Sequence, residues 1–249
     1  MKVCVIGLGT IGIPTIKYIH EHGFQAYGYD LIEKSISSIE TFTDWKKVPN
    51  SDIYVVTVSS NEVENACRYI SNKDKVSLVL IESTVLVGTC RRISNALGLK
   101  ALAHCPHRYW AEDPVNHGVR QLRAIGAVNE KSLERTLEFY RLLDIPLHVC
   151  PTIEIAEMCK IAENAYRFVQ VSFAEELKTI CEEKKISFDE VRKACNTKWN
   201  TEILEAREGI LGSCLPKDIG YLKLLTSRSP LIDGAILTDE IYRKRIRNV

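Results

Sequence analysis

The sequence has no apolar run that approaches the roughly 18 residues needed to cross a bilayer. Its amino terminus also lacks the apolar core and cleavage site of a secretory signal, because Gly7 interrupts the first short apolar run. None of the nine cysteines forms a C-x-x-C pair, and most lie in apolar runs, where a thiol behaves as a small hydrophobe. We therefore expect a cytoplasmic protein in a reducing compartment.

Neither sign of charge is in excess, since 33 basic and 32 acidic residues leave a net charge of +1. This balance gives no electrostatic reason to expect nucleic acid or a membrane as partner. His104, Cys105 and His107 offer too few ligands at workable spacing for zinc, so we expect no metal site. A chain of 249 residues is long enough for two modest domains.

A β-branched run at 2–6 leads directly into the segment GLGTIG at 7–12, which opens an amphipathic stretch through His22. This order predicts a strand, a tight turn and a helix whose N-terminus can hold a pyrophosphate. A second predicted strand, 25–29, ends in Asp30, close to the spacing of a carboxylate that accepts from a ribose hydroxyl. We expect these residues to bind NAD rather than NADP, with FAD as the main competitor: Gly7, Gly9, Thr10, Ile11, Gly12 and Asp30.

Further apolar runs predict buried strands at 53–58, 78–81, 101–103, 124–128 and 147–149, with βα-type connections among the later ones. From Thr152 the apolar spacing becomes helical, which predicts one helix of about 30 residues up to Lys185. Shorter helices are predicted at 187–196, 217–226 and 231–247. The fold class is therefore α/β, with a Rossmann-type doubly wound sheet over 1–151 and an all-helical domain over 152–249. A helix so long needs a second neighbour to cover it, and a homodimer interface is the simplest one.

Cys214 lies in GILGSCLPKD at 209–218, where Pro216 predicts the start of a helix. A helix N-terminus and the nearby Lys217 favour the thiolate, which is the attacking form of a nucleophilic cysteine. Lys160 and Asn164 are spaced at i and i+4 on the long helix, so both project from one face. Lys160 has apolar neighbours and is suited to stabilise an alkoxide or to accept a proton.

Four segments together resemble the UDP-glucose/GDP-mannose dehydrogenase family, including its UDP-N-acetylmannosamine dehydrogenase branch. They are GLGTIG at 7–12, ESTVLVGTCRRI at 82–93, AEMCKIAENAYRFVQVSFAEEL at 156–177 and GILGSCLPKD at 209–218. The resemblance implies a four-electron oxidation of a nucleotide-sugar primary alcohol to a carboxylate with two NAD in succession, through a thiohemiacetal and a thioester on cysteine. Carried over by position, Cys214 is the nucleophile and Lys160 the base or oxyanion stabiliser. Asn164 and Asp218 position the oxyanion and the water, and Thr84 lies near the nicotinamide.

The sequence departs from the family pattern at several positions. His107 stands where the family has a glutamate that helps hydrolysis, although a neutral imidazole can still act as a general base. Glu175 stands where Asn is common, and the glycine run before Cys214 is reduced. After residue 247 the family continues into a nucleotide-binding domain, which this shortened form is expected to lack. A separate chain would then complete the substrate site, or the sequence is truncated, or the substrate is smaller.

Two alternatives remain open from the sequence. A β-hydroxyacid dehydrogenase also carries Lys and Asn one turn apart on a long helix, but it transfers two electrons and needs no nucleophile such as Cys214. A noncatalytic NAD-binding subunit would keep the fold and the long helix without turnover.

Overall fold

The computed structural model describes residues 1–73 and 78–247 and divides into two compact units. The sheet unit is Met1–Lys160 and the helical unit is Ile161–Val249, so the division falls within the long helix. The sequence instead predicts a domain boundary at the start of that helix. In the described part of the chain, no helix is both long and apolar enough to cross a membrane.

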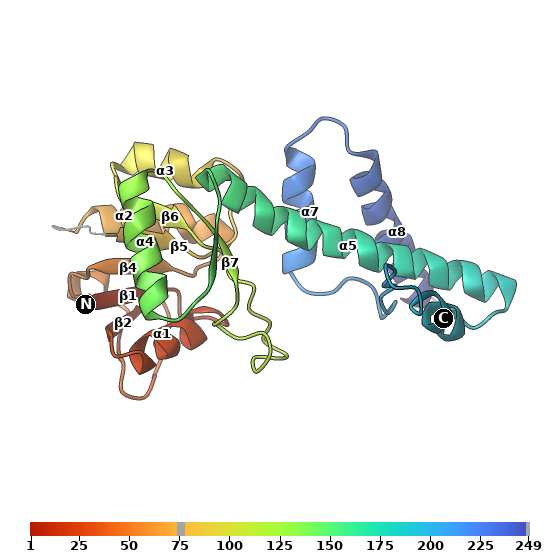
Figure 1. Ribbon diagram of the computed structural model, residues 1–249, viewed down its shortest axis with the longest axis horizontal. Coiled ribbons are helices and arrows are strands. Elements are labelled where there is room, and N and C mark those ends of the chain that lie inside the picture. Colours follow the sequence, from red (N-terminus) through yellow and green to blue (C-terminus); the bar gives the residue numbers. More distant parts are fainter. Residues whose placement is uncertain (74–77, 248–249) are drawn as a thin grey trace. The chain divides into compact units, whose positions relative to one another are not determined.

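The sheet unit alternates strands with helices along the chain (Figure 1). Its elements are β1 (Lys2–Ile6), α1 (Gly12–Glu21), β2 (Gln25–Tyr29), β3 (Glu40–Phe42), β4 (Ile53–Val56), α2 (Val63–Ser71), β5 (Leu78–Ile81), α3 (Thr89–Leu97), β6 (Leu102–His104), β7 (Arg123–Ala127), α4 (Glu130–Leu142) and β8 (Leu147–Val149). The strands lie in the order β3-β2-β1-β4-β5-β6-β7-β8. From β1 the chain adds strands first on one side, β2 and β3, and then on the other side, starting with β4. The boundary between β1 and β4, which are parallel, is therefore the switch point where open α/β sheets bind ligands.

Both faces of the sheet are covered, because alternate residues of each strand point to opposite sides. Val3 and Val5 pack with side chains of α1 and α4, whereas Cys4 and Ile6 pack with side chains of α2 and α3. For this reason β4 and β5 are apolar throughout, and β1 is apolar from Val3 onward. The doubly wound architecture predicted from the sequence is confirmed.

The structure corrects several details of the predicted sheet. The strand predicted at 53–58 ends at Val56, and β3 was not predicted. β7 pairs antiparallel with β6, and the described segment 105–122 between them contains no helix. His148 and Val149 are exposed rather than buried, since β8 has a partner strand on one side only and lies at the sheet edge.

The helical unit consists of the later part of α5 (Ile153–Lys184), with α6 (Phe188–Cys195), α7 (Cys214–Leu224) and α8 (Pro230–Arg247). The predicted helices are confirmed within three residues, and α7 begins at Cys214 itself rather than at Lys217. Its core joins three helices through Phe168 on α5, Ile219 on α7 and Ala235 on α8. The helix α5 is 32 residues long, and Figure 1 shows it as one unbroken helix.

The residues that predicted an apolar face on α5 are only partly covered. Within the helical unit, Tyr166 is 65% exposed, Phe173 56% and Ile180 47%. Large apolar side chains in such a row on one helix are typical of an interface.

A buried charge cluster ties the carboxyl end of β5 to three other parts of the sheet unit. Glu82 Oε1 accepts from Arg123 at 3.0 Å and from the hydroxyl of Tyr140, and Glu82 Oε2 contacts Nε2 of His107. Nε2 of His107 also lies 3.0 Å from the hydroxyl of Thr15 on α1. Arg123 is fully buried, and Glu82 is 4% exposed.

Electrostatics favours the ionised form of Glu82. Burial alone raises the pKa of this carboxyl, but the adjacent His107 and Arg123 outweigh burial and lower it to about 2. Burial, together with the positive charge of Arg123, lowers the pKa of His107. The cluster therefore holds Glu82 as a carboxylate that is paired with Arg123 and in contact with His107.

Arg123→Ala should destabilise the sheet unit by about 3–5 kcal/mol, because it leaves the Glu82 carboxylate buried without its cation. The exposed Arg120 pairs with Asp144 at 2.7 Å, and Arg120→Ala should cost less than about 1 kcal/mol. Urea unfolding of the two variants at pH 7 compares them directly. An equal loss in both would contradict the assignment of the buried ion pair.

The same ion pair predicts how acid affects stability. The pKa of Glu82 in the folded chain lies below that of an ordinary carboxyl, so its contribution is present above about pH 4.3 and is lost as pH falls.

Candidate active site

The turn between β1 and α1 requires glycine at two positions. Gly7 has φ of +92°, and a Cβ there would meet Val58 Cγ1 at 2.7 Å. A Cβ on Gly12 would lie 1.8 Å from the carbonyl oxygen of Gly7, so α1 approaches the strand closely only because residue 12 is glycine. These contacts give Gly7 and Gly12 the structural roles that the sequence predicts for them.

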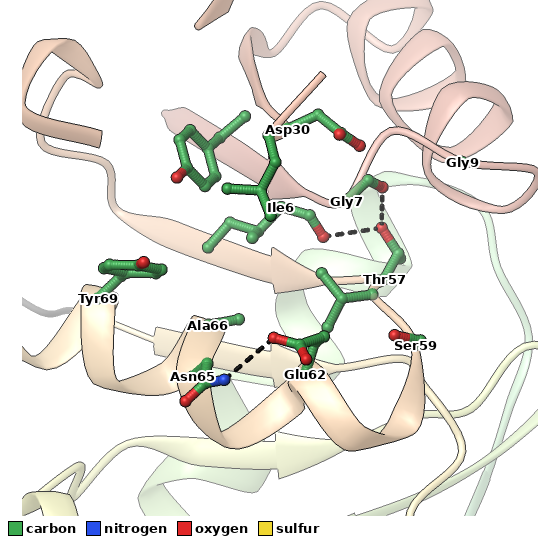
Figure 2. Close-up of a pocket in the computed structure, with 13 residues that line it drawn as sticks. Ile6, Gly7, Gly9, Asp30, Thr57, Ser59, Glu62, Asn65, Ala66 and Tyr69 are labelled. Atoms are coloured by element: carbon green, nitrogen blue, oxygen red, sulfur yellow. Dashed lines mark hydrogen bonds between the residues drawn. The ribbon is translucent and has the colours of Figure 1, made fainter. Parts of the chain in front are cut away.

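A pocket of about 320 Å³ opens beside this turn at the carboxyl ends of β1, β2 and β4 (Figure 2). Figure 2 shows Asp30 and Gly7 on one side of the pocket, with Glu62, Asn65 and Tyr69 on the other. The pocket is lined by Ile6, Gly7, Gly9, Tyr29, Asp30, Leu31, Thr57, Val58, Ser59, Glu62, Asn65, Ala66 and Tyr69. It therefore lies at the switch point of the sheet.

The residues of this pocket fit a dinucleotide. Within residues 1–73 and 78–247, no atom beyond its chain neighbours lies within 4 Å of a Cβ built on Gly9, so open space is left where a pyrophosphate would approach the backbone. Ile11 is the N-cap of α1, and its side chain has no oxygen to cap the first-turn N–H groups, which stay suited to an anion. Thr10 is exposed in the same turn.

Asp30 follows β2 directly and faces the pocket. One carboxylate oxygen accepts from the N–H of Leu8 at 2.7 Å, and the other accepts from the N–H of Ile32 at 2.9 Å. A carboxylate has about four acceptor sites, so Asp30 can also accept from a ribose hydroxyl.

The part of the pocket that comes from β4 and α2 was not predicted from the sequence. The hydroxyl of Thr57 donates to the carbonyl oxygens of Ile6, at 3.1 Å, and of Gly7, at 2.8 Å, and so holds the glycine turn (Figure 2). Thr57 follows directly after the buried strand β4, a position that would have marked it as a pocket residue. The sequence predicted that this strand continues through Val58, so Thr57 was counted as part of the strand.

Thr84 lies three residues after β5, outside the pocket beside the glycine turn. Its carbonyl oxygen accepts from the hydroxyl of Ser60 at 2.6 Å. The loop that follows is held by Glu157 of α5, whose carboxylate accepts from the N–H groups of Gly88, at 2.6 Å, and Cys90, at 2.8 Å. Glu157 therefore caps the N-terminus of α3, and burial raises the pKa of its carboxyl.

In the helical unit, two of the predicted catalytic residues meet. The side-chain amide of Asn164 on α5 donates to Asp218 Oδ2 on α7. Asp218 is 1% exposed, and its other oxygen pairs with Lys217. Cys214 is the exposed first residue of α7, one turn before Asp218, so both project from the same face of that helix. The thiol is accessible beside a fixed carboxylate.

Lys160 belongs to the sheet unit and Cys214 to the helical unit, so their meeting stays a prediction. Lys160 lies one turn before Asn164 on α5 and projects from the same face.

His107, which the sequence suggested as a general base, is 7% exposed and contacts Glu82 and Thr15. Among the described residues, no group of three or more His, Cys, Asp or Glu side chains could hold a metal ion.

Comparison with known proteins agrees with these motifs. Residues 154–233 match the central domain of the UDP-glucose/GDP-mannose dehydrogenase family. The UDP-N-acetyl-D-mannosamine dehydrogenase of Methanococcus vannielii is 27% identical over 94% of this chain. The chain spans 64% of the length of that relative.

Solved structures share the fold. A UDP-D-ManNAc dehydrogenase from Pyrococcus horikoshii superposes with a TM-score of 0.87 and 25% identity, over 97% of this chain and 69% of that one. A 3-hydroxyisobutyrate dehydrogenase from Mycobacterium tuberculosis has a TM-score of 0.77 and 16% identity, over 98% of this chain and 92% of that one. The second similarity shows the fold alone. The chain is thus similar to members of the UDP-glucose/GDP-mannose dehydrogenase family, which confirms the resemblance that its four motifs predict.

Proposed function

We propose that the chain catalyses the NAD-dependent oxidation of a nucleotide-sugar primary alcohol to a carboxylate through covalent attachment to Cys214. The observation that carries the proposal is the exposed thiol at the first residue of α7, one turn before an Asp218 that accepts from Asn164. A two-electron dehydrogenase has no use for such a thiol. The names of the relatives support a UDP-sugar such as UDP-N-acetyl-D-mannosamine as substrate.

NAD is the proposed cofactor, held by the glycine turn and by Asp30. Gly9 leaves room for the pyrophosphate, to which the N–H groups of Thr10 and Ile11 would donate. The carboxylate of Asp30 favours a ribose hydroxyl over a 2′-phosphate, because the phosphate would meet like charge. When bound, NAD would accept the hydride in each of two oxidations, with Thr84 near the nicotinamide.

The roles of the catalytic side chains follow from their chemistry. In the first oxidation Lys160 takes the proton of the alcohol hydroxyl as the hydride leaves. The thiolate of Cys214 then adds to the carbonyl carbon of the aldehyde, and Lys160 stabilises the resulting oxyanion. Loss of a second hydride from this thiohemiacetal gives a thioester. Asn164 and Asp218 hold the water that cleaves the thioester and releases the thiol. In total, one alcohol, one water and two NAD⁺ yield one carboxylate, two NADH and three protons.

A β-hydroxyacid dehydrogenase remains the alternative, because a protein of that class shares the fold over nearly the whole of both chains. Fold similarity does not separate the two reactions, but their stoichiometries do. A cytoplasmic location, inferred from cysteine usage, stays a prediction.

We also propose that the chain forms a homodimer through the exposed row on α5 that includes Tyr166, Phe173 and Ile180. A stable interface of standard size needs about 800 Å² from each partner, and large apolar side chains at its centre contribute most of the binding energy.

Cys214→Ser should lower kcat for carboxylate formation by about a thousandfold or more, because a hydroxyl replaces the thiolate that forms the covalent bond. A panel of UDP- and GDP-sugars with NAD, followed at 340 nm, should give two NADH per carboxylate in the unsubstituted chain. Cys195→Ser is the control, since Cys195 is a partly buried thiol on α6. One NADH per product without loss in Cys214→Ser would favour the β-hydroxyacid alternative. No NADH with any sugar would favour the noncatalytic subunit.

Asp30→Ala should weaken NAD binding by about tenfold or more, since hydrogen bonds to charged groups contribute roughly 1.5–3 kcal/mol. The affinity for NADP should weaken less than the affinity for NAD, so the ratio of the two affinities should move closer to one. Calorimetric titration measures both, with the exposed Glu33→Ala as control. An unchanged NAD affinity would remove Asp30 from the site.

Phe173→Glu should convert the dimer to a monomer by placing charge in the proposed interface. Trp199, which is 92% exposed outside α5, provides the control variant Trp199→Glu. Sedimentation equilibrium distinguishes the two states, and an unsubstituted chain that sediments as a monomer would refute the interface.

A further inference from the structure

A second buried charge cluster lies within the helical unit. It consists of Glu175 on α5 together with Asp239 and Arg243 on α8. Glu175 is fully buried, and Asp239 is 3% exposed. Nε of Arg243 lies 3.1 Å from Asp239 Oδ2, one turn apart on the same helix. Arg243 is thus paired with Asp239, and its positive charge also acts on the carboxyl group of Glu175.

The cluster holds the backbone that leads to Cys214. The N–H of Ile210 donates to Asp239 Oδ1 at 2.8 Å, in a buried hydrogen bond. Gly209 has φ of +92° and packs so closely on Arg243 that a Cβ there would lie 2.2 Å from its Cγ. Both contacts come from α8, so α8 determines the path of the chain at residues 209 and 210.

Two other contacts fix the same stretch. The hydroxyl of Tyr242 on α8 donates to the carbonyl oxygen of Arg207 at 2.9 Å. The side chain of Ile210 is buried in the core that also contains Phe168 and Ile219. Residues 211–213 are exposed, and Cys214 follows four positions after Ile210. Ile210 is therefore the buried anchor of the loop from which the proposed nucleophile projects.

Glu175 is buried, and neither of its oxygens has a hydrogen-bond partner among the described residues. The charges that face it are Asp239, which disfavours its ionisation, and Arg243, which favours it. Lys178, on the next turn of α5, lies with its Nζ 5.7 Å from the ring centroid of Tyr242. Burial and Asp239 raise the pKa of Glu175 to about 7.

The protonation state of Glu175 determines whether Asp239 alone, or Asp239 and Glu175 together, interact with the positive charge of Arg243. A neutral Glu175 leaves the guanidinium to Asp239, whose other oxygen holds the Ile210 N–H. An ionised Glu175 places a second negative charge beside Asp239 and competes for the same cation.

We propose that Glu175, Asp239 and Arg243 are positioning residues for Cys214, and that a neutral Glu175 lets Asp239 and Arg243 hold the Gly209–Ile210 backbone and so fix the thiol at the N-terminus of α7. The inference rests on the proposed function only in taking Cys214 as the nucleophile. Because the pKa of Glu175 in the folded chain is raised, the stabilising effect is complete below an ordinary carboxyl pKa and is lost as pH rises through about 7.

Amide hydrogen exchange at Ile210 tests the proton dependence without any enzyme assay. Glu175→Gln keeps the side chain neutral, so its protection of Ile210 should equal that of the unsubstituted chain near about pH 5.5 and exceed it by about threefold or more near about pH 8.5. Glu176→Gln, an exposed neighbour on α5, should change nothing at either pH. The Val191 amide of α6, which donates to Ser187, should be unaffected in both variants. If Glu175→Gln and the unsubstituted chain protected the Ile210 amide equally at both pH values, the proposed role of Glu175 would be overturned.

The link to the thiol is tested with Asp239→Asn, which keeps the shape of the side chain but removes its charge. The rate of Cys214 alkylation by iodoacetamide, followed by peptide mass spectrometry, should fall by about threefold or more as the loop loosens and the thiol leaves the helix N-terminus. Glu240→Gln is the exposed control on α8. An unchanged alkylation rate would overturn the positioning of Cys214, even if Ile210 lost protection. NADH formation has no part in this test, so a chain without dehydrogenase activity would refute the proposed function and not this one.

Discussion

The hydrogen bond from Asn164 to Asp218 is the contact on which the proposed chemistry depends. It joins α5 to the first turn of α7, and Asp218 is buried where they meet. Because Cys214 lies one turn earlier on the same face of α7, this bond also fixes the direction of the helix end that carries the thiol. Lys160 lies one turn before Asn164 on α5, so helical periodicity alone places both residues of that motif on one face.

The cofactor pocket depends on a separate constraint, the close packing of the glycine turn. Gly12 contacts the carbonyl of Gly7 at a distance that excludes any side chain, and Thr57 donates to that same carbonyl. The turn can therefore approach a ligand only where Gly9 leaves open space. Each unit thus contributes a proposed site built from contacts within itself, the sheet unit the proposed dinucleotide pocket and the helical unit the surroundings of the Cys214 thiol.

Features carried by local pattern were predictable from the sequence. Apolar spacing, together with the glycine segment between them, predicts the strands Lys2–Ile6 and Gln25–Tyr29. Apolar spacing alone predicts the long α5 helix. The edge strand β8 and the antiparallel β7 were not predictable in the same way, because pairing and exposure depend on which strands become neighbours. Buried charges were hidden for a similar reason: Glu82 meets residues 41 and 58 positions away, and Asp239 meets Ile210 across 29.

The most direct test of the account is to capture the intermediate on the sulfur. The chain would be mixed with NAD and UDP-N-acetyl-D-mannosamine, quenched in acid during turnover, digested, and analysed by mass spectrometry. Covalent catalysis at Cys214 predicts a peptide containing Cys214 with the mass of the thioester-linked sugar nucleotide, and no such mass on a peptide containing Cys195. NADH formation with Cys214 unmodified at every time point would contradict it.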